Sequence, residues 1–401
     1  MKISKTYHQA KVAPLGDGRE KAHSEIEKSE VSSVSQADRV SLSKVSKPSF
    51  KLGAAEMREV SEGLAFNSAL ESALPPTLSA GISASFQSGF VDTYLTPQSI
   101  QERTRALAAE FPDLVQVIDT GFDTHGYDGS NKAVRGPSDL VYLRLGPQTS
   151  ERDNKVGVFQ YAAPHARERV NPMTMMELTE QLVRNYDPES SNPQVRANTK
   201  LLQELDVFVA INTNPDGHNF AAFDDPMWRK NRAPVPGGAK GVDINRNYPY
   251  EWEPSRNPRG QTYSGSGPAS EAETKSLLKV VEAHPNIKYV VDWHSHGEEI
   301  RRPLNVTAGD SKVYDELHGR VQKAIGDVAG TNYETVVSRV TRGTSDDHFY
   351  KVNGIFSTVM ETGTSFTPRE DEALSVMRES VAGAREFLQV ASEQVQKGLV
   401  S

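Results

Sequence analysis

The chain has 401 residues, a formal net charge of −8 and no cysteine. Without cysteine it can form no disulfide, no thiolate metal site and no thiol nucleophile, so any metal must be bound by His, Asp or Glu. The acidic balance predicts that the chain repels nucleic acid and anionic membranes, and we expect neither as a partner.

The first 92 residues differ in composition from the rest of the chain. They begin without the uninterrupted apolar segment of a secretory signal, so a cytoplasmic location is the default, and export by another route stays open. We expect residues 1–92 to be a largely disordered leader and linker, because a stretch rich in Ser, Glu and Lys buries too little apolar surface to offset the entropy of ordering. Residues 53–72 carry the spacing of a short amphipathic helix, which could dock on a partner or inhibit the chain's own site.

From residue 93 to residue 401, short apolar runs alternate with helical patterns. The expected strands are LVQVID (114–119), LVYLRL (140–145), VGVFQYAA (156–163), LDVFVAIN (205–212), IKYVVDW (287–293) and IFSTVM (355–360). The expected helices lie within 173–186, 271–284, 311–325 and 370–391. Apolar strands separated by helices predict an α/β fold, with a mainly parallel mixed sheet and helices on both faces.

Polar or reactive residues follow four of these strands directly. His165 and Glu168 follow one strand, TNPDG (213–217) follows a second, His294 follows a third and Glu361 follows a fourth. Because ligands bind beyond the carboxyl ends of parallel strands, the pattern predicts one polar site at one edge of the sheet. His and Glu three positions apart can face the same side of a turn, and two His with one Glu form a catalytic zinc site in other proteins. For the first pair alone, an exposed ion-pair cluster is the alternative.

Seven motifs stand in the order and approximate spacing found in the zinc metallocarboxypeptidases of the carboxypeptidase A/B type. They are HARE (165–168), NPDG (214–217), WRKNR (228–232), GVDINRNY (241–248), DWHSH (292–296), GTSDDHFY (343–350) and METGTSF (360–366). The chain resembles this family over about residues 93–396. The resemblance implies that 93–401 is a catalytic domain, with one Zn²⁺ per chain and a peptide or protein C-terminus as its substrate.

The resemblance also implies which residues hold the metal. His165, Glu168 and His294 resemble the zinc ligands, and His296 is the rival for the third position. Asp243 resembles the carboxylate that orients a zinc-bound imidazole. A loop Asp that bonds nearby backbone is the alternative for this residue.

The remaining roles concern the substrate. Glu361 resembles the general base, which takes a proton from a Zn-activated water and passes it to the departing amine. Arg229 resembles the arginine that stabilises the developing oxyanion. Asn245 and Arg246 resemble the pair that binds the substrate's terminal carboxylate, which restricts hydrolysis to the C-terminal peptide bond.

Asp346 aligns with the bottom of the family's side-chain pocket, where an acid accompanies a preference for terminal Arg or Lys. Two alternatives are a one-residue slip that places Asp347 there, and a role for both acids at the N-terminus of a short helix. The chain departs from the family where animal digestive members carry a mobile tyrosine. Arg339 stands at that position, and Tyr333 is too far upstream to match.

Two other functions stay open as alternatives. The same fold and metal could act on bacterial cell-wall peptides or on glutamylated side chains, which the missing tyrosine and Arg339 motivate. An inactive zinc-binding protein, which recruits partners through the leader, belongs to another class. The complete set of ligands together with Glu361 argues against it.

Overall fold

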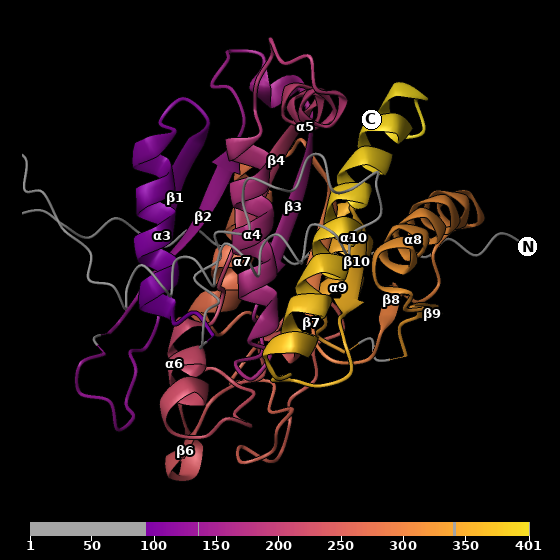
Figure 1. The fold of residues 1–401 in the computed structure, drawn as a ribbon. Helices are drawn as coiled ribbons and strands as arrows, with labels where there is room; N and C mark the ends of the chain where they lie inside the picture. Colours follow the sequence, from indigo (N-terminus) through magenta and orange to yellow (C-terminus); the bar gives the residue numbers. More distant parts are fainter. Residues whose placement is uncertain (1–93, 135, 340–341, 401) are drawn as a thin grey trace, which may run out of the picture. The chain divides into compact units, whose positions relative to one another are not determined.

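The computed structural model describes residues 94–134, 136–339 and 342–400, so the expected leader and the amphipathic segment at 53–72 lie outside the described residues. The described part is built on an eight-stranded sheet with the strand order β1-β2-β4-β3-β7-β10-β8-β9 (Figure 1). Its strands are β1 (Val115–Asp123), β2 (Asp139–Leu145), β3 (Val156–Ala162), β4 (Leu205–Ala210), β7 (Ile287–His294), β8 (Glu299–Arg302), β9 (Glu334–Val337) and β10 (Phe356–Glu361). A separate two-stranded ribbon joins β5 (Pro234–Val235) and β6 (Ala239–Lys240).

The centre of the sheet is parallel and its flanks are partly antiparallel. β4, β3, β7 and β10 are parallel neighbours, whereas β1 with β2, β2 with β4, and β8 with β10 pair antiparallel. Every residue of β3 and β4 is buried, as expected for strands that are covered on both faces. Their continuous apolar sequence reflects this burial, and the predicted fold class is confirmed.

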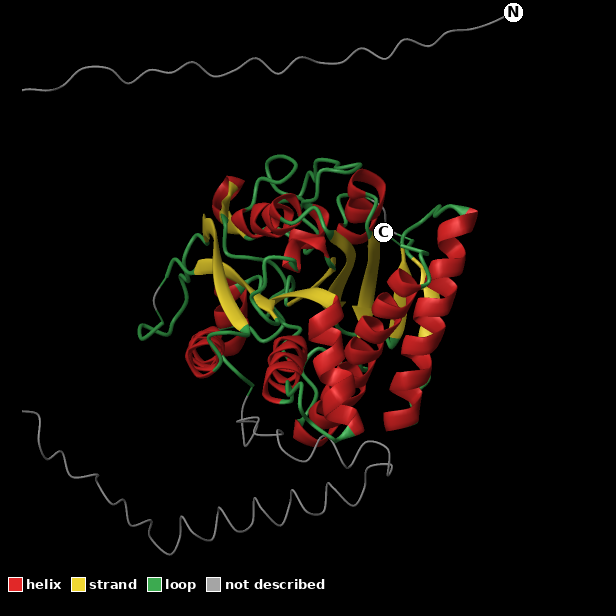
Figure 2. Ribbon diagram, turned by 90° about the horizontal axis from the view of Figure 1, so that it is seen from above, coloured by secondary structure: helices red, strands yellow, loops and turns green. Residues whose placement is uncertain are grey.

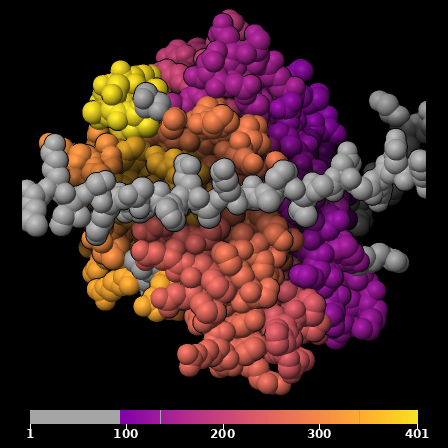
Figure 3. Space-filling model, turned by 180° about the vertical axis from the view of Figure 1, so that it is seen from behind, coloured from indigo at the N-terminus to yellow at the C-terminus, as the bar shows by residue number. Residues whose placement is uncertain are grey.

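Helices cover both faces of the sheet (Figure 2). They are α3 (Pro97–Glu110), α4 (Val170–Arg184), α5 (Pro193–Glu204), α6 (Pro215–Phe223), α7 (Ala272–Ala283), α8 (Ala308–Ala329), α9 (Ser345–Asn353) and α10 (Glu370–Gln396), with short 3₁₀ turns η1 (Arg152–Asn154), η2 (Pro236–Gly238) and η3 (Ile244–Arg246). One apolar cluster joins the sheet to α3, α4, α5, α8 and α10, and a second joins it to α7 and α9. Seen from behind, residues from the second half of the chain, coloured salmon to yellow, lie on the left and centre of the surface, and indigo to purple residues lie on the right (Figure 3). None of the described helices is both long and apolar enough to cross a membrane.

The sequence analysis missed the elements whose local pattern is weakest. β8 and β9 have four residues each, and most of their side chains are partly exposed, so they show no apolar run. α5 and α6 begin instead with strong caps, at Asn192 and Asn214, each followed by Pro at the first helical position. Asn214 also donates to the carbonyl oxygen of Pro164 at 3.0 Å, so the NPDG motif supports the loop that contains His165.

Candidate functional site

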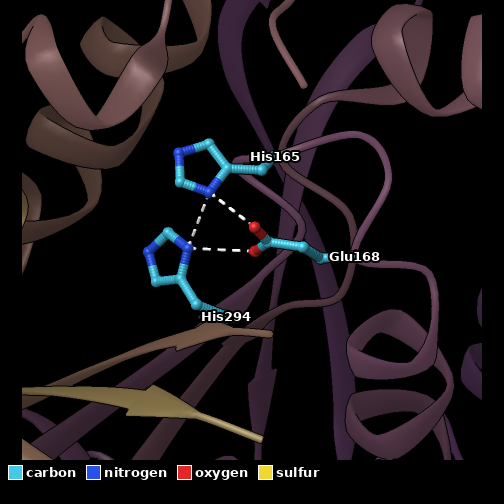
Figure 4. A group of neighbouring side chains, drawn as sticks. All are labelled: His165, Glu168 and His294. Atoms are coloured by element: carbon cyan, nitrogen blue, oxygen red, sulfur yellow. Dashed lines mark hydrogen bonds and ion pairs between the residues drawn. The ribbon is translucent and has the colours of Figure 1, made fainter. Parts of the chain in front are cut away.

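Three side chains that could bind a metal ion meet beyond the carboxyl ends of β3 and β7 (Figure 4). His165 and Glu168 lie in the loop between β3 and α4, and His294 is the last residue of β7. One ligand atom from each residue lies within 4.8 Å of the other two. Among the described residues, no other group of three or more His, Asp and Glu comes this close.

The donor atoms of this cluster face one another. Nδ1 of His165 lies 2.9 Å from Oε1 of Glu168 and 2.9 Å from Nδ1 of His294, which lies 3.0 Å from Oε2 of Glu168. The other nitrogen of each imidazole, Nε2, faces a carboxylate. Nε2 of His165 lies 3.1 Å from Asp243, and Nε2 of His294 lies 3.0 Å from Asp292. When a ring is neutral, its contact with a carboxylate places the proton on Nε2 and leaves a lone pair on Nδ1 for a metal ion. A cation between the Nδ1 atoms and the carboxylate removes their repulsion, and this set of ligands fits zinc.

Burial makes the cluster depend on its charges. His165, Glu168 and His294 are only 1 to 2% exposed. Burial acts to raise the pKa of Glu168, but the two imidazoles outweigh it and hold that pKa well below its usual range. Burial acts to lower the pKa of His294, but the carboxylates of Asp292 and Glu168 raise it well above its usual value. Both shifts show that the site favours a positive charge beside Glu168.

Asp243 joins the metal cluster to Arg229. Its carboxylate is fully buried, and besides His165 it accepts from Nε of Arg229 at 3.1 Å, from Nη2 of Arg229 at 2.9 Å and from the backbone N–H of Asn245 at 3.0 Å. Burial acts to raise the pKa of Asp243, but Arg229 and His165 hold it well below its usual range. The residue therefore orients an imidazole and also bonds nearby backbone, so the two interpretations do not exclude each other.

Asp292 is a site residue that the sequence analysis did not identify. It lies two positions before His294 on β7, and its Oδ2 accepts from Oγ of Ser345 at 2.6 Å as well as facing the imidazole. Strand alternation was the available signal, because residues two apart on a strand point to the same face. An acid at that offset from a candidate His ligand is a candidate orienting group.

Glu361 ends β10 directly beside the metal cluster. Its partner in the parallel register is His294, the last residue of β7. Burial raises the pKa of the Glu361 carboxyl, which favours holding a proton. Oε1 of Glu361 lies 3.0 Å from Nη1 of Arg301, a residue of β8 that the sequence analysis did not single out.

A cavity of about 380 Å³ opens beside the cluster, within the size range of small-molecule sites. It brings together the predicted substrate residues, namely Arg229, Asn245, Arg246, Asp346 and Glu361. These residues come from loops, from η3, from α9 and from the end of β10, so they share one space only in the folded chain.

Asp346 lies in the first turn of α9 and also lines this cavity. It is 3% exposed, and it accepts a hydrogen bond from Oγ of Ser338. The helix interpretation and the pocket interpretation thus describe the same residue. Asp347 follows it in the helix, where burial and the neighbouring Asp346 raise the pKa of Asp347 to about 7.

Three residues remain from the sequence analysis: His296, the alternative metal ligand, and Tyr333 and Arg339, which concern the missing family tyrosine. His296 packs its ring against Phe366, with 4.5 Å between the ring centroids. Tyr333 is buried, and its hydroxyl donates to Glu379 at 2.6 Å, so it is a fixed part of the core and not a mobile residue at the site. Arg339 is exposed and lines the cavity.

The fold and the buried cluster of two His and one Glu define an α/β protein with a zinc site of the catalytic type. Residues 100–383 match the model of the Zinc carboxypeptidase family, and the chain belongs to this family.

The chain is also similar in sequence to individual proteins that are named as carboxypeptidases. Carboxypeptidase A4 of Mus musculus is 27% identical over 269 residues, which is 64% of this chain and 59% of that protein. A metallocarboxypeptidase A-like protein of Trichophyton verrucosum is 32% identical over 197 residues, which is 47% of this chain and 44% of that protein. The chain therefore spans about half the length of these curated relatives.

Solved structures show the same fold at low identity. The carboxypeptidase A of Helicoverpa armigera superimposes with a TM-score of 0.65 at 21% identity, over 84% of this chain and 82% of that one. Thrombin activatable fibrinolysis inhibitor superimposes with a TM-score of 0.66 at 18% identity, over 85% of this chain and 87% of that one.

Proposed function

We propose that this chain is a zinc-dependent exopeptidase of the carboxypeptidase A/B type, which hydrolyses the C-terminal peptide bond of peptides or proteins. One observation carries the proposal. A single cavity beside the metal cluster is lined by a candidate base, Glu361, a candidate oxyanion partner, Arg229, and a candidate carboxylate clamp, Asn245 with Arg246. Removal of a C-terminal residue requires these three tasks at one peptide bond.

The residues divide the reaction among them. His165, Glu168 and His294 would hold the zinc ion, which would act as a Lewis acid at this site. Glu361 takes a proton from the attacking water and passes it to the departing amine, a task that suits a carboxyl whose pKa burial has raised. Arg229 donates to the negative oxygen that develops on the scissile carbonyl. Arg246 binds the terminal carboxylate, which selects the last peptide bond.

Asp346 supports a preference for C-terminal Arg or Lys, because it is a buried acid on the wall of the cavity. The second candidate is an acidic substrate, such as a glutamylated side chain. It draws on Arg301 and Arg339, which line the same cavity. The two candidates place opposite charges on the released residue, so substrates that end in Arg and in Glu separate them.

The test measures release of free amino acids from N-blocked dipeptides that end in Arg, Lys, Leu, Phe or Glu. We expect release by the zinc-loaded chain, its loss after treatment with a chelator, and its return on addition of zinc. The same peptides with an amidated C-terminus are the matched control, and they should resist hydrolysis because Arg246 has no carboxylate to bind. A folded, zinc-loaded chain that releases nothing from any substrate contradicts the proposal and favours the inactive zinc-binding alternative.

We further propose that residues 93–401 suffice as the catalytic domain, in the cytoplasm. Residues 1–92 precede it directly, which motivates a role in self-inhibition. A chain beginning at residue 93 is then expected to release amino acids faster than the full chain. Equal rates from both chains would exclude self-inhibition.

A further inference from the structure

Arg301 places a positive charge on the wall of the cavity and belongs to none of the seven motifs. It lies on β8, two residues after Glu299, so both side chains leave the strand on the same face. β8 pairs antiparallel with β10, where Glu299 lies opposite Glu361 and Arg301 lies opposite Val359. All four residues line the cavity, so the strand register brings this guanidinium to the substrate space.

Two carboxylates hold the guanidinium in place. Nη1 of Arg301 lies 3.0 Å from Oε1 of Glu361, and Nε lies 2.6 Å from Oε2 of Glu299. Glu299 and Glu361 are direct cross-strand partners, and two like charges in that position repel each other without a counter-charge. Arg301 supplies this counter-charge. Its side chain is still 34% exposed, so it remains available to a substrate in the cavity.

The same cavity is also lined by a carboxylate, whose charge is opposite to that of Arg301. Asp346 lines the cavity from α9 and is held by Ser338, whereas Arg301 lines it from β8. Asp346 attracts a basic side chain and repels an acidic one, and Arg301 does the reverse. Selection by charge therefore depends on all the charges of the cavity wall, including Arg301, and cannot follow from Asp346 alone.

We propose that Arg301 is a specificity-determining residue of this cavity, which disfavours basic C-terminal side chains and favours acidic ones against the effect of Asp346. The inference rests on the proposed exopeptidase function, because it concerns the residue that is released. It predicts the direction in which selectivity changes when Arg301 is replaced, whichever side chain the unmodified chain prefers.

The experiment compares kcat/KM for N-blocked dipeptides ending in Arg, Leu or Glu. Both Arg301→Met and Arg301→Gln are expected to raise the ratio of Arg-ended to Glu-ended efficiency by roughly tenfold or more, because loss of one charge acts on the two substrates in opposite directions. Arg301→Lys keeps the charge and is expected to keep the ratio within about threefold. Any displacement of Glu361 lowers kcat for every substrate alike and cancels in the ratio.

Arg302→Met is the matched control on the same strand. The Arg302 guanidinium donates to Oγ of Ser311, a residue of α8, at 2.6 Å. We therefore expect the Arg302→Met variant to leave the ratio unchanged. If either folded neutral variant of Arg301 hydrolyses its substrates at an unchanged ratio, the inference is wrong while the exopeptidase function stands. If the unmodified chain hydrolyses none of the substrates, both fail together.

Discussion

Replacing Asp292 by Asn keeps the shape of the side chain and removes its charge. In the folded chain, Oδ2 of Asp292 lies 3.0 Å from Nε2 of His294 and accepts from Oγ of Ser345, and the residue is 2% exposed. The negative charge makes Nδ1 of His294 a better metal donor and fixes the ring so that Nδ1 faces Glu168. Asparagine can still accept from Nε2, but only as a neutral group.

The size of the effect follows from this difference. Hydrogen bonds to charged groups contribute about 1.5–3 kcal/mol and neutral ones about 1 kcal/mol, so the substitution should cost roughly 0.5–2 kcal/mol of zinc-binding free energy. At about 1.4 kcal/mol for each factor of ten, the zinc dissociation constant should rise about 2- to 30-fold. This range overlaps the roughly 10- to 100-fold loss that is typical when a partner of a metal-binding His is changed.

The assay is competition for zinc between the folded chain and a chromophoric chelator. Ser345→Ala is the matched control, because it removes one hydrogen bond to Asp292 and leaves the carboxylate charge, so it should weaken zinc binding less than Asp292→Asn. An unchanged dissociation constant in a folded Asp292→Asn chain would refute the reasoning that Asp292 orients His294.

Three further substitutions test other parts of the site and the core. Glu361→Gln should lower kcat by about 10²–10⁴-fold, because the base is lost, with zinc content unchanged. Asp346→Ser should lower kcat/KM for Arg-ended dipeptides and spare Leu-ended ones. Burial, with Glu271 beside it, raises the pKa of the fully buried Glu273 from 4.5 to about 8. The folded chain thus keeps a proton that the unfolded chain releases, and stability should fall as the pH rises between these values, by up to about 1.4 kcal/mol per pH unit. Glu273→Gln should remove this loss, and thermal unfolding at pH 5 and pH 8 measures it.

Each of these predictions has an opposite outcome. Full activity in Glu361→Gln would assign the proton transfer to another group. An equal fall for Arg-ended and Leu-ended substrates in Asp346→Ser would mean a general structural defect. A Glu273→Gln chain that follows the unmodified chain in melting temperature at both pH values would show that Glu273 is not held neutral by the fold.

Much of the fold was predictable because it rests on local patterns. β3 and β7 are mainly apolar, and the predicted helices overlap α4, α7, α8 and α10 closely. β8 and β9 were not predictable in this way. β8 has one buried residue and β9 has none, so neither shows a buried face, and these strands exist because β10 and β8 offer them partners.

The site divides along the same line. His165 and Glu168 are three residues apart, so a single turn brings them together, and the resemblance of the surrounding motifs to the metallocarboxypeptidases predicted them as metal ligands. The role of Arg301 appears only in the folded chain, because strand direction and register decide which side chains meet. Arg301 reaches Glu361 across 60 positions, through the pairing of β8 with β10, and no spacing in the sequence encodes that contact. The kinds of chemical group at the site were thus determined by the amino-acid sequence itself, whereas the balance of charge around a substrate was decided by tertiary structure, because Coulomb interactions depend on distances that only packing sets.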